Sequence, residues 1–316
     1  MSLAFMPADG LFTGVFSVLP TPFGPTGEVD HESLQRVVDL FVGAGINGVT
    51  ALGVTSEVAR LTERERGRVL ETVLQHVNGR VPVVAGASAD GLRTCLQYTR
   101  HAREAGAAAV MISPPRMPKI NSDAVVRHFS EVASANDIPI VVQDYPPISG
   151  FAMEPALLVR IAREIPGART IKLEDPPTPF KISRILELTA REGALDVRIF
   201  GGLGGVFLLE ELMAGAAGAM TGFAFPELLV AIVRHFRNGR VDEAADLFYS
   251  TVALMRFEFQ ESIGMAIRKE ALARRGAIAH AGIRAPGGQL DRTTREALDR
   301  VMKWAEAQTA ARGVRL

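Results

Sequence analysis

The sequence predicts an α/β fold, a (β/α)8 TIM barrel with a C-terminal helical extension. Eight short runs of apolar and β-branched residues alternate with longer segments of helical period. After the eighth pair the pattern becomes helical only. Right-handed crossovers close eight parallel strands most simply into a barrel, so we favour this fold over the alternative, a doubly wound open sheet.

The expected strands are short and rich in β-branched or small apolar residues. They span 14–19, 48–52, 81–87, 108–113, 138–144, 170–174, 197–201 and 217–221. Asp30 precedes the first helical segment, and residues 62–65 (TERE) resemble a capping box ahead of the second. Further helices are expected to begin near Gly91, Ser122, Glu154, Thr178, Leu203 and Pro226.

The chain is expected to contain one barrel and its extension. Residues 1–11 form a lead-in without a basic residue ahead of an apolar core, so they do not resemble a secretory signal. Residues 12–238 form the barrel and 239–316 the helical extension, with helices over 241–257, 262–274 and 291–310. The low-charge run 214–233 contains glycine, proline and glutamate, which favours a strand and a helix over a membrane span.

Charge and cysteine content exclude several classes of function. The 35 basic and 35 acidic residues cancel, and no basic stripe with interleaved aromatics is present, so no nucleic-acid partner is expected. A membrane partner is not expected either. The single cysteine, Cys95, rules out an internal disulfide framework and agrees with a cytoplasmic location.

The positions after the strands exclude metal and dinucleotide chemistry. All six histidines fall in or beside helical or C-terminal segments, so neither a metal site nor a Ser-His pair is expected at the strand ends. Residues 201–205 (GGLGG) lack the register of a dinucleotide-binding loop and indicate a tight turn. No cofactor is predicted.

Lys172 is the one cation at an expected strand end, within residues 170–175 (TIKLED). A buried ammonium is costly unless it is paired, here with Glu174 or Asp175, or loses its proton to become a nucleophilic amine. Residues 53–57 (GVTSE) form a turn whose N–H groups and hydroxyls suit a small carboxylate, although Thr55 and Ser56 could instead cap a helix. An amine and a carboxylate cradle together predict Schiff-base chemistry on a 2-oxo acid.

Several of these residues also form a family signature. Residues 53–57 followed by 59–65 (ARLTERE) resemble the G-[TS]-T-G-E…L-[ST]-x-x-E-[RK] pattern of the dihydrodipicolinate synthase / N-acetylneuraminate lyase family, and residues 19–23 (LPTPF) resemble its opening element. The likeness spans nearly the whole chain. It implies a TIM barrel, class I aldolase chemistry on pyruvate or a longer 2-oxo acid, and a homo-oligomer, either a dimer or a tetramer. It also implies that Lys172 forms the Schiff base and that Val54 and Thr55 hold the carboxylate.

The chain departs from the family pattern where the synthases handle their second substrate. Gln143 stands where the family has its proton-relay tyrosine, and Tyr145, about 6 to 7 Å further along the strand, is the candidate replacement. Val54 replaces a hydroxyl residue, residues 113–116 (SPPR) lack the expected tyrosine, and Ile148 replaces an arginine. These changes predict a family member that is not a true dihydrodipicolinate synthase.

We therefore predict an aldolase or dehydratase acting on a 2-keto-3-deoxy sugar acid or a related 2-oxo acid. Its expected catalytic residues are Lys172, Tyr145 and Gln143. Its expected substrate contacts, at strand ends or in the loops after them, are Val54, Thr55, Ser56, Asp144, Gly202 and Thr221. The alternative is a catalytically weakened paralogue that binds a 2-oxo acid as a sensor or assembly partner.

Overall fold

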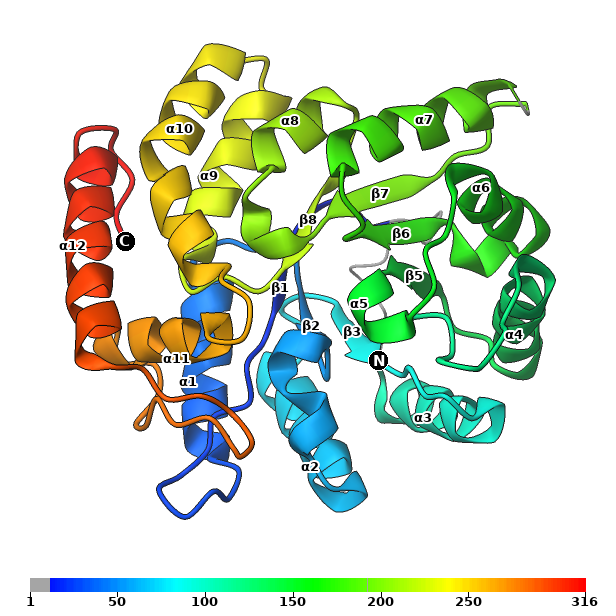
Figure 1. Ribbon diagram of the computed structural model, residues 1–316, viewed down its shortest axis with the longest axis horizontal. Helices are drawn as coiled ribbons and strands as arrows, with labels where there is room; N and C mark the ends of the chain where they lie inside the picture. The colour runs from blue at the N-terminus through cyan, green and yellow to red at the C-terminus, as the bar shows by residue number, and fades with distance from the viewer. Residues whose placement is uncertain (1–11, 192) are drawn as a thin grey trace.

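Eight parallel strands close into a barrel ringed by helices in the computed structural model, which describes residues 12–191 and 193–316 (Figure 1). The predicted fold is confirmed. The strands are β1 Gly14–Val18, β2 Gly48–Ala51, β3 Val83–Gly86, β4 Ala109–Ile112, β5 Ile140–Asp144, β6 Thr170–Leu173, β7 Arg198–Gly201 and β8 Gly218–Thr221. Each lies within its predicted range. The expected lead-in, residues 1–11, falls outside the described residues.

Helices follow the strands and begin close to the predicted positions. They are α1 His31–Gly43, α2 Glu63–Val77, α3 Leu92–Ala105, α4 Ser122–Ala135, α5 Pro146–Ser149, α6 Pro155–Glu164, α7 Thr178–Arg191, α8 Leu208–Met213 and α9 Pro226–Arg237. The Asp30 side chain accepts from the Ser33 N–H, and Thr62 and Glu65 form the predicted capping box. The helix expected near Leu203 begins as the 3-10 turn η4 Leu203–Gly205 and is followed by α8. Sequence reasoning missed the short helix α5 and the 3-10 turns η1 Val54–Ser56, η2 Val58–Arg60 and η3 Pro166–Ala168.

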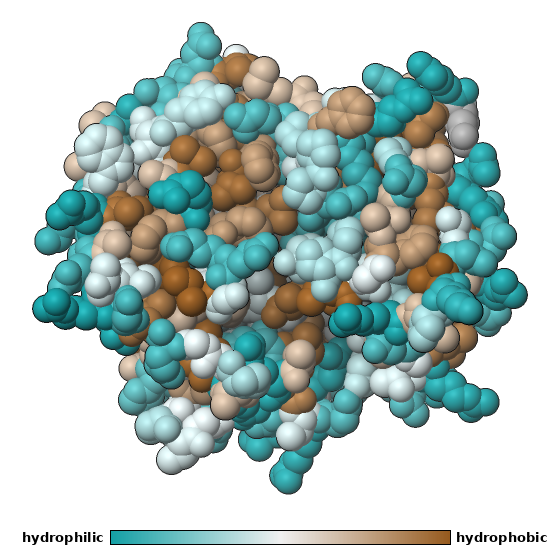
Figure 2. Space-filling view, viewed as in Figure 1, coloured by the Kyte–Doolittle hydropathy of each residue, from teal (hydrophilic) through white to brown (hydrophobic). Residues whose placement is uncertain are grey.

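Strand side chains point alternately inward and outward, so the barrel has two apolar layers. One lies inside the ring of strands and the other between the strands and the helices. The inner layer includes Phe16, Phe200 and Met220, which are 1% exposed or less, and the two phenylalanine rings meet edge to face at 5.5 Å. The outer layer joins the strands to the helices. On the face of the molecule that Figure 2 shows, apolar side chains gather toward the middle and hydrophilic ones lie around the rim.

The C-terminal extension consists of α10 Val241–Glu258, α11 Gly264–Arg274 and α12 Arg292–Ala310. Helix α10 packs against α9 and α12, and in Figure 1 the three last helices stand along one flank of the barrel. The domain boundary at residue 238 stays a prediction.

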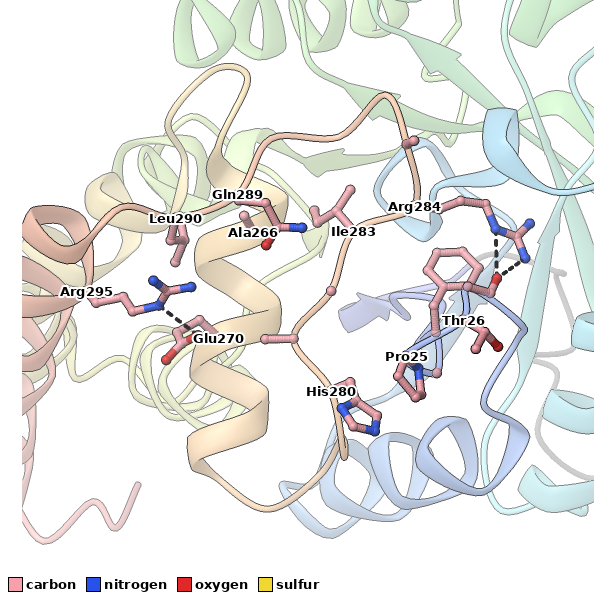
Figure 3. Close-up of a pocket in the computed structure, with 16 residues that line it drawn as sticks. Pro25, Thr26, Ala266, Glu270, His280, Ile283, Arg284, Gln289, Leu290 and Arg295 are labelled. Atoms are coloured by element: carbon pink, nitrogen blue, oxygen red, sulfur yellow. Dashed lines mark hydrogen bonds and ion pairs between the residues drawn. The ribbon is translucent and has the colours of Figure 1, made fainter.

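Buried charges connect this extension to the barrel. The Lys269 amine, on α11, pairs with the Glu57 carboxylate in the turn after β2, and both side chains are fully buried. Lys269 also donates to the Gly282 carbonyl at 3.1 Å. Nearby, Arg284 donates to the Gly27 carbonyl, so the loop after α11 is fixed to the loop after β1 (Figure 3). Arg284 also pairs with Glu65 on α2.

The Lys269–Glu57 pair leads to a stability prediction. Burial lowers the pKa of Lys269 although Glu57 opposes this shift. Without Lys269, the buried Glu57 carboxylate keeps only the longer contact of 3.5 Å with Arg60. We expect Lys269→Met to lower the free energy of unfolding by about 3 to 5 kcal/mol in chemical denaturation. Lys269→Met combined with Glu57→Gln is expected to recover part of this loss, and the exposed Lys303→Met is the matched control. A neutral Lys269→Met variant would contradict the prediction.

Candidate active site

Lys172 lies on β6 and faces the interior of the barrel. In the sheet register it is the neighbour of Gln143 on β5 and of Phe200 on β7. Its side chain is 5% exposed, so its amine requires a partner within the protein. That partner is the Glu174 carboxylate, whose Oε2 lies 3.0 Å from the Lys172 Nζ.

Glu174 is the centre of a buried polar network. It comes two residues after Lys172, so alternation along the strand direction places both side chains on the same side. The Gln143 Nε2 donates to the same Glu174 oxygen at 2.6 Å, and the Gln143 Oε1 accepts from the Ser113 hydroxyl at 3.0 Å. Ser113, Gln143, Glu174 and Lys172 thus form one continuous chain of contacts across three adjacent strand ends.

Gly202 makes room for this network. A Cβ atom on Gly202 would lie 2.3 Å from the Glu174 Cγ and 2.7 Å from its Oε1. Real contacts are never this short, so any side chain at position 202 would displace the carboxylate from Lys172. Gly202, predicted as a substrate contact, lies directly beside the Glu174 side chain.

Tyr145 lies at the beginning of α5, directly after β5, and is half-buried. Burial raises the pKa of its phenol, and the carboxylates of Glu174 and Glu261 raise it further. The phenol therefore keeps its proton at neutral pH beside the Glu174 network, in a state that can donate a proton but not accept one from carbon.

The turn after β2 places Val54 and Thr55 in the 3-10 turn η1. In the closed barrel β2 lies across from β6, so this turn and Lys172 occupy opposite sides of the same barrel end. The Thr55 hydroxyl oxygen is buried and has no hydrogen-bond partner among residues 12–191 and 193–316. An unpaired buried hydroxyl is unfavourable, which makes Thr55 a suitable ligand contact.

Three predicted substrate contacts make hydrogen bonds within the protein, and their contact with substrate stays a prediction. Asp144 faces outward from β5, and its carboxylate pairs with Lys181 and accepts from the Met153 N–H, because the strand alternates and Gln143 takes the inward position. The Ser56 hydroxyl donates to the Leu19 carbonyl and accepts from the Gly53 N–H, which fixes the turn itself. The Thr221 hydroxyl accepts from the Gly204 N–H and holds η4.

Sequence reasoning assigned Glu174 only as a possible neutralising partner of Lys172 and did not place it among the catalytic residues. The available signal was its position two residues after the lysine, on the same strand face. Ser113 was read as part of a missing tyrosine motif and not as a hydrogen-bond partner of Gln143. Its hydroxyl meets Gln143 because β4 and β5 are adjacent.

A cavity of about 330 Å³ opens beside the network. Gln143, Ser113 and Met111 line it on the barrel side, and Gly53 and Val54 line it on the side of the β2 turn. A larger hollow of about 580 Å³ lies elsewhere, between α11 and the loop after β1, where Arg295 pairs with Glu270 (Figure 3). The smaller cavity therefore gives the Gln143 end of the network a space for a ligand.

Metal ligands and membrane-spanning helices were also sought. Within the described residues, no group of three or more His, Cys, Asp and Glu side chains is arranged to hold a metal ion. In the same part of the chain, no helix is long and apolar enough to cross a membrane.

A buried lysine at a barrel strand end, in contact with a carboxylate and across from a hydroxyl-bearing turn, is typical of Schiff-base-forming lyases. Comparisons with known proteins agree. The model of the dihydrodipicolinate synthetase family matches residues 11–305. The chain belongs to this family and is a lyase of the class I aldolase type.

Individual relatives span most of the chain. It is 36% identical over 293 residues to L-2-keto-3-deoxyarabonate dehydratase of Azospirillum brasilense, covering 90% of this chain and 92% of the relative. It is 34% identical over 256 residues to 4-hydroxy-tetrahydrodipicolinate synthase of Methanothrix thermoacetophila, covering 80% and 83%. The crystal structure of dihydrodipicolinate synthase from Rhodopseudomonas palustris matches with a TM-score of 0.87 and 33% identity, covering 93% of this chain and 97% of the other.

Glu211 on α8 is a further buried carboxyl group behind the site. Its Oε1 accepts from the Thr178 hydroxyl at 2.6 Å, its Oε2 has no partner among the described residues, and Gly201 leaves space for it. Burial raises the pKa of Glu211 to about 7, and Glu210 and Glu174 add to the shift. The neutral acid is therefore the form that the fold favours.

This shift predicts a pH dependence of stability. Because the folded-state pKa of Glu211 is raised, its contribution is fully present below the unfolded value near 4.5 and is lost as pH rises through about 7. We expect Glu211→Gln to raise the melting temperature at pH 8 and to leave it nearly unchanged at pH 5. Glu104→Gln, at an exposed position on α3, is the control. An equal effect of Glu211→Gln at both pH values would contradict the assignment.

Proposed function

We propose that this chain is a Schiff-base-forming dehydratase of a 2-keto-3-deoxy sugar acid. The observation that supports this most directly is the contact of 3.0 Å between the Lys172 amine and the Glu174 carboxylate, which Gln143 holds in place. The 36% identical relative is a dehydratase of such an acid, L-2-keto-3-deoxyarabonate. Gln143, Val54 and Ile148 stand where the family resemblance places groups of the synthase reaction, which argues against a synthase.

The reaction begins with imine formation. Transfer of a proton from Lys172 to Glu174 leaves a neutral amine, which attacks the C2 carbonyl of the substrate and forms an iminium ion with loss of water. The positive iminium nitrogen draws electrons from C3, so a proton on C3 becomes acidic. Glu174, once ionised again, is the base that removes this proton and gives an enamine.

Elimination completes the dehydration. The enamine electrons expel the C4 hydroxyl, which leaves as water when an acid supplies a proton. We propose that Tyr145 is this acid, because its phenol is half-buried beside Glu174 and keeps its proton. Hydrolysis of the resulting unsaturated iminium returns the Lys172 amine and releases an unsaturated 2-oxo acid. Each turnover removes one molecule of water from the substrate.

The alternative, a paralogue that only binds a 2-oxo acid, receives less support. It was motivated by the absence of the family tyrosine at position 143. The Glu174 carboxylate supplies a proton acceptor at hydrogen-bond distance from Lys172, so the site does not lack a base. The buried hydrogen bonds of Gln143 to Ser113 and Glu174 also favour a maintained catalytic site.

We further propose a homo-oligomer, dimer or tetramer, as the family resemblance implies. Large apolar side chains on the outer helices are exposed, among them Phe180 at 70%, Met213 at 65% and Trp304 at 57%. Such residues are common at subunit interfaces. A cytoplasmic location stays a prediction.

Imine formation is tested by trapping with pyruvate and borohydride. Mass spectrometry of the wild-type protein is expected to find the reduced adduct on Lys172, because reduction fixes the iminium as a stable secondary amine. Lys172→Ala is expected to abolish the adduct, whereas Lys119→Ala, an exposed lysine in the loop after β4, is expected to retain it. Absence of an adduct in the wild-type protein would refute the lyase proposal.

The roles of Glu174 and Tyr145 are separated by proton exchange. If Glu174 removes the C3 proton, Glu174→Gln is expected to slow exchange of the pyruvate methyl protons in D2O by about 100-fold or more, measured by NMR. Tyr145→Phe is expected to retain exchange but to slow dehydration of 2-keto-3-deoxy sugar acids by about tenfold or more. Unchanged exchange in Glu174→Gln would remove Glu174 as the base. Release of pyruvate and an aldehyde, instead of water, would identify an aldolase.

A further inference from the structure

Helix α11 brings a second buried cation, Arg268, to the barrel end that contains the active site. A Cβ atom on Gly222 would lie 2.0 Å from the Arg268 Nη1 and 2.9 Å from the Thr55 Oγ1. Gly222 comes two residues after the inward-facing Met220, so it faces the same side of β8. The missing side chain at position 222 therefore lets the guanidinium and the hydroxyl approach the same point above the barrel.

Arg268 is buried but does not use all of its hydrogen-bond donors. The side chain is 4% exposed, and its Nε donates to the Glu258 Oε1 at 2.5 Å. Its Nη1 contacts only the Met265 sulfur at 3.8 Å, a weak acceptor. A buried guanidinium normally donates to strong acceptors, so Nη1 lacks an oxygen partner that a ligand could supply.

Glu258 fixes the direction of the guanidinium. Glu258 is the last residue of α10 and is 2% exposed, and its second oxygen accepts from the Ala224 N–H at 3.0 Å, just after β8. One carboxylate thus connects α10, α11 and the loop after β8. Because the Nε side of Arg268 is held there, its Nη1 is directed at the position beside Gly222 and Thr55.

Two polar groups without a strong acceptor or donor partner therefore meet at one place. The Thr55 hydroxyl is buried without a partner, and the Arg268 Nη1 lies against the same glycine. Both can donate a hydrogen bond, one of them with a positive charge. The complementary ligand is an anion with two acceptor oxygens, and a carboxylate has this charge and shape.

We propose that Arg268, together with Thr55, binds the C1 carboxylate of the 2-oxo acid. The β2 turn that contains Thr55 lies across the barrel from β6, so a substrate with its carboxylate there presents its C2 carbonyl toward Lys172. The C-terminal extension then contributes a residue to the active site and restricts the enzyme to 2-oxo acids over uncharged ketones. This inference rests on the proposed function.

The experiment compares pyruvate with pyruvamide, in which an uncharged amide replaces the carboxylate. Borohydride trapping on Lys172 is measured against the concentration of each compound. Arg268→Met is expected to raise the half-saturating pyruvate concentration by about tenfold or more, because a charge-assisted hydrogen bond is lost. Trapping of pyruvamide is expected to change less than twofold. Arg268→Lys keeps the positive charge but lacks the planar guanidinium. Its half-saturating pyruvate concentration is expected to lie between those of the wild-type protein and Arg268→Met.

Arg275→Met is the matched control. Arg275 follows α11, pairs with Glu227 at 2.6 Å and also connects the extension to the barrel, but it does not contact Gly222 or Thr55. The Arg275→Met variant is expected to trap pyruvate at the same half-saturating concentration as the wild-type protein. Equal weakening of pyruvate and pyruvamide in Arg268→Met, or an unchanged pyruvate affinity, would overturn the inference while leaving the lyase proposal intact. Failure of the wild-type protein to trap pyruvate would refute the proposed function instead.

Discussion

The contact between the Lys172 amine and the Glu174 carboxylate is the interaction on which the site depends. An amine at a strand position inside a barrel is costly as an isolated charge, and its partner must come from the same buried layer. Glu174 fulfils this requirement at 3.0 Å, Gln143 binds the same oxygen, and Gly202 provides the space. One carboxylate thus stabilises the buried lysine and, in the proposed mechanism, is also the base.

The C-terminal helices complete the end of the barrel that contains this pair. Lys269 and Arg268 are consecutive residues on α11, yet one pairs with Glu57 after β2 and the other with Glu258 at the end of α10. Lys269 thus fixes the turn after β2, and Glu258 in turn accepts from the Ala224 N–H in the loop after β8. Loops after barrel strands are where catalytic groups of this fold lie. The extension is therefore a structural part of the active-site end as well as a surface addition.

The sequence predicted the fold well because the relevant signals are local. Strand runs, the Asp30 cap and the Thr62 capping box each depend on a few neighbouring residues. The site was predicted less completely. Asp144 and Gln143 are adjacent in sequence, but only one can face inward, and the pattern alone did not decide which. Arg268 lies more than 200 residues from Thr55, so only the folded chain reveals that they meet at Gly222.

The exchange of the family tyrosine for Gln143 has a chemical consequence. A phenol at that position can pass protons in both directions, whereas an amide can only orient a neighbour. Here the amide orients Glu174, whose carboxylate contacts the nitrogen that forms the iminium in the proposed mechanism. Since C3 of the substrate is two bonds from that nitrogen, a base in this position is close to the proton whose removal starts an elimination. The same replacement therefore disfavours the synthase reaction and favours dehydration.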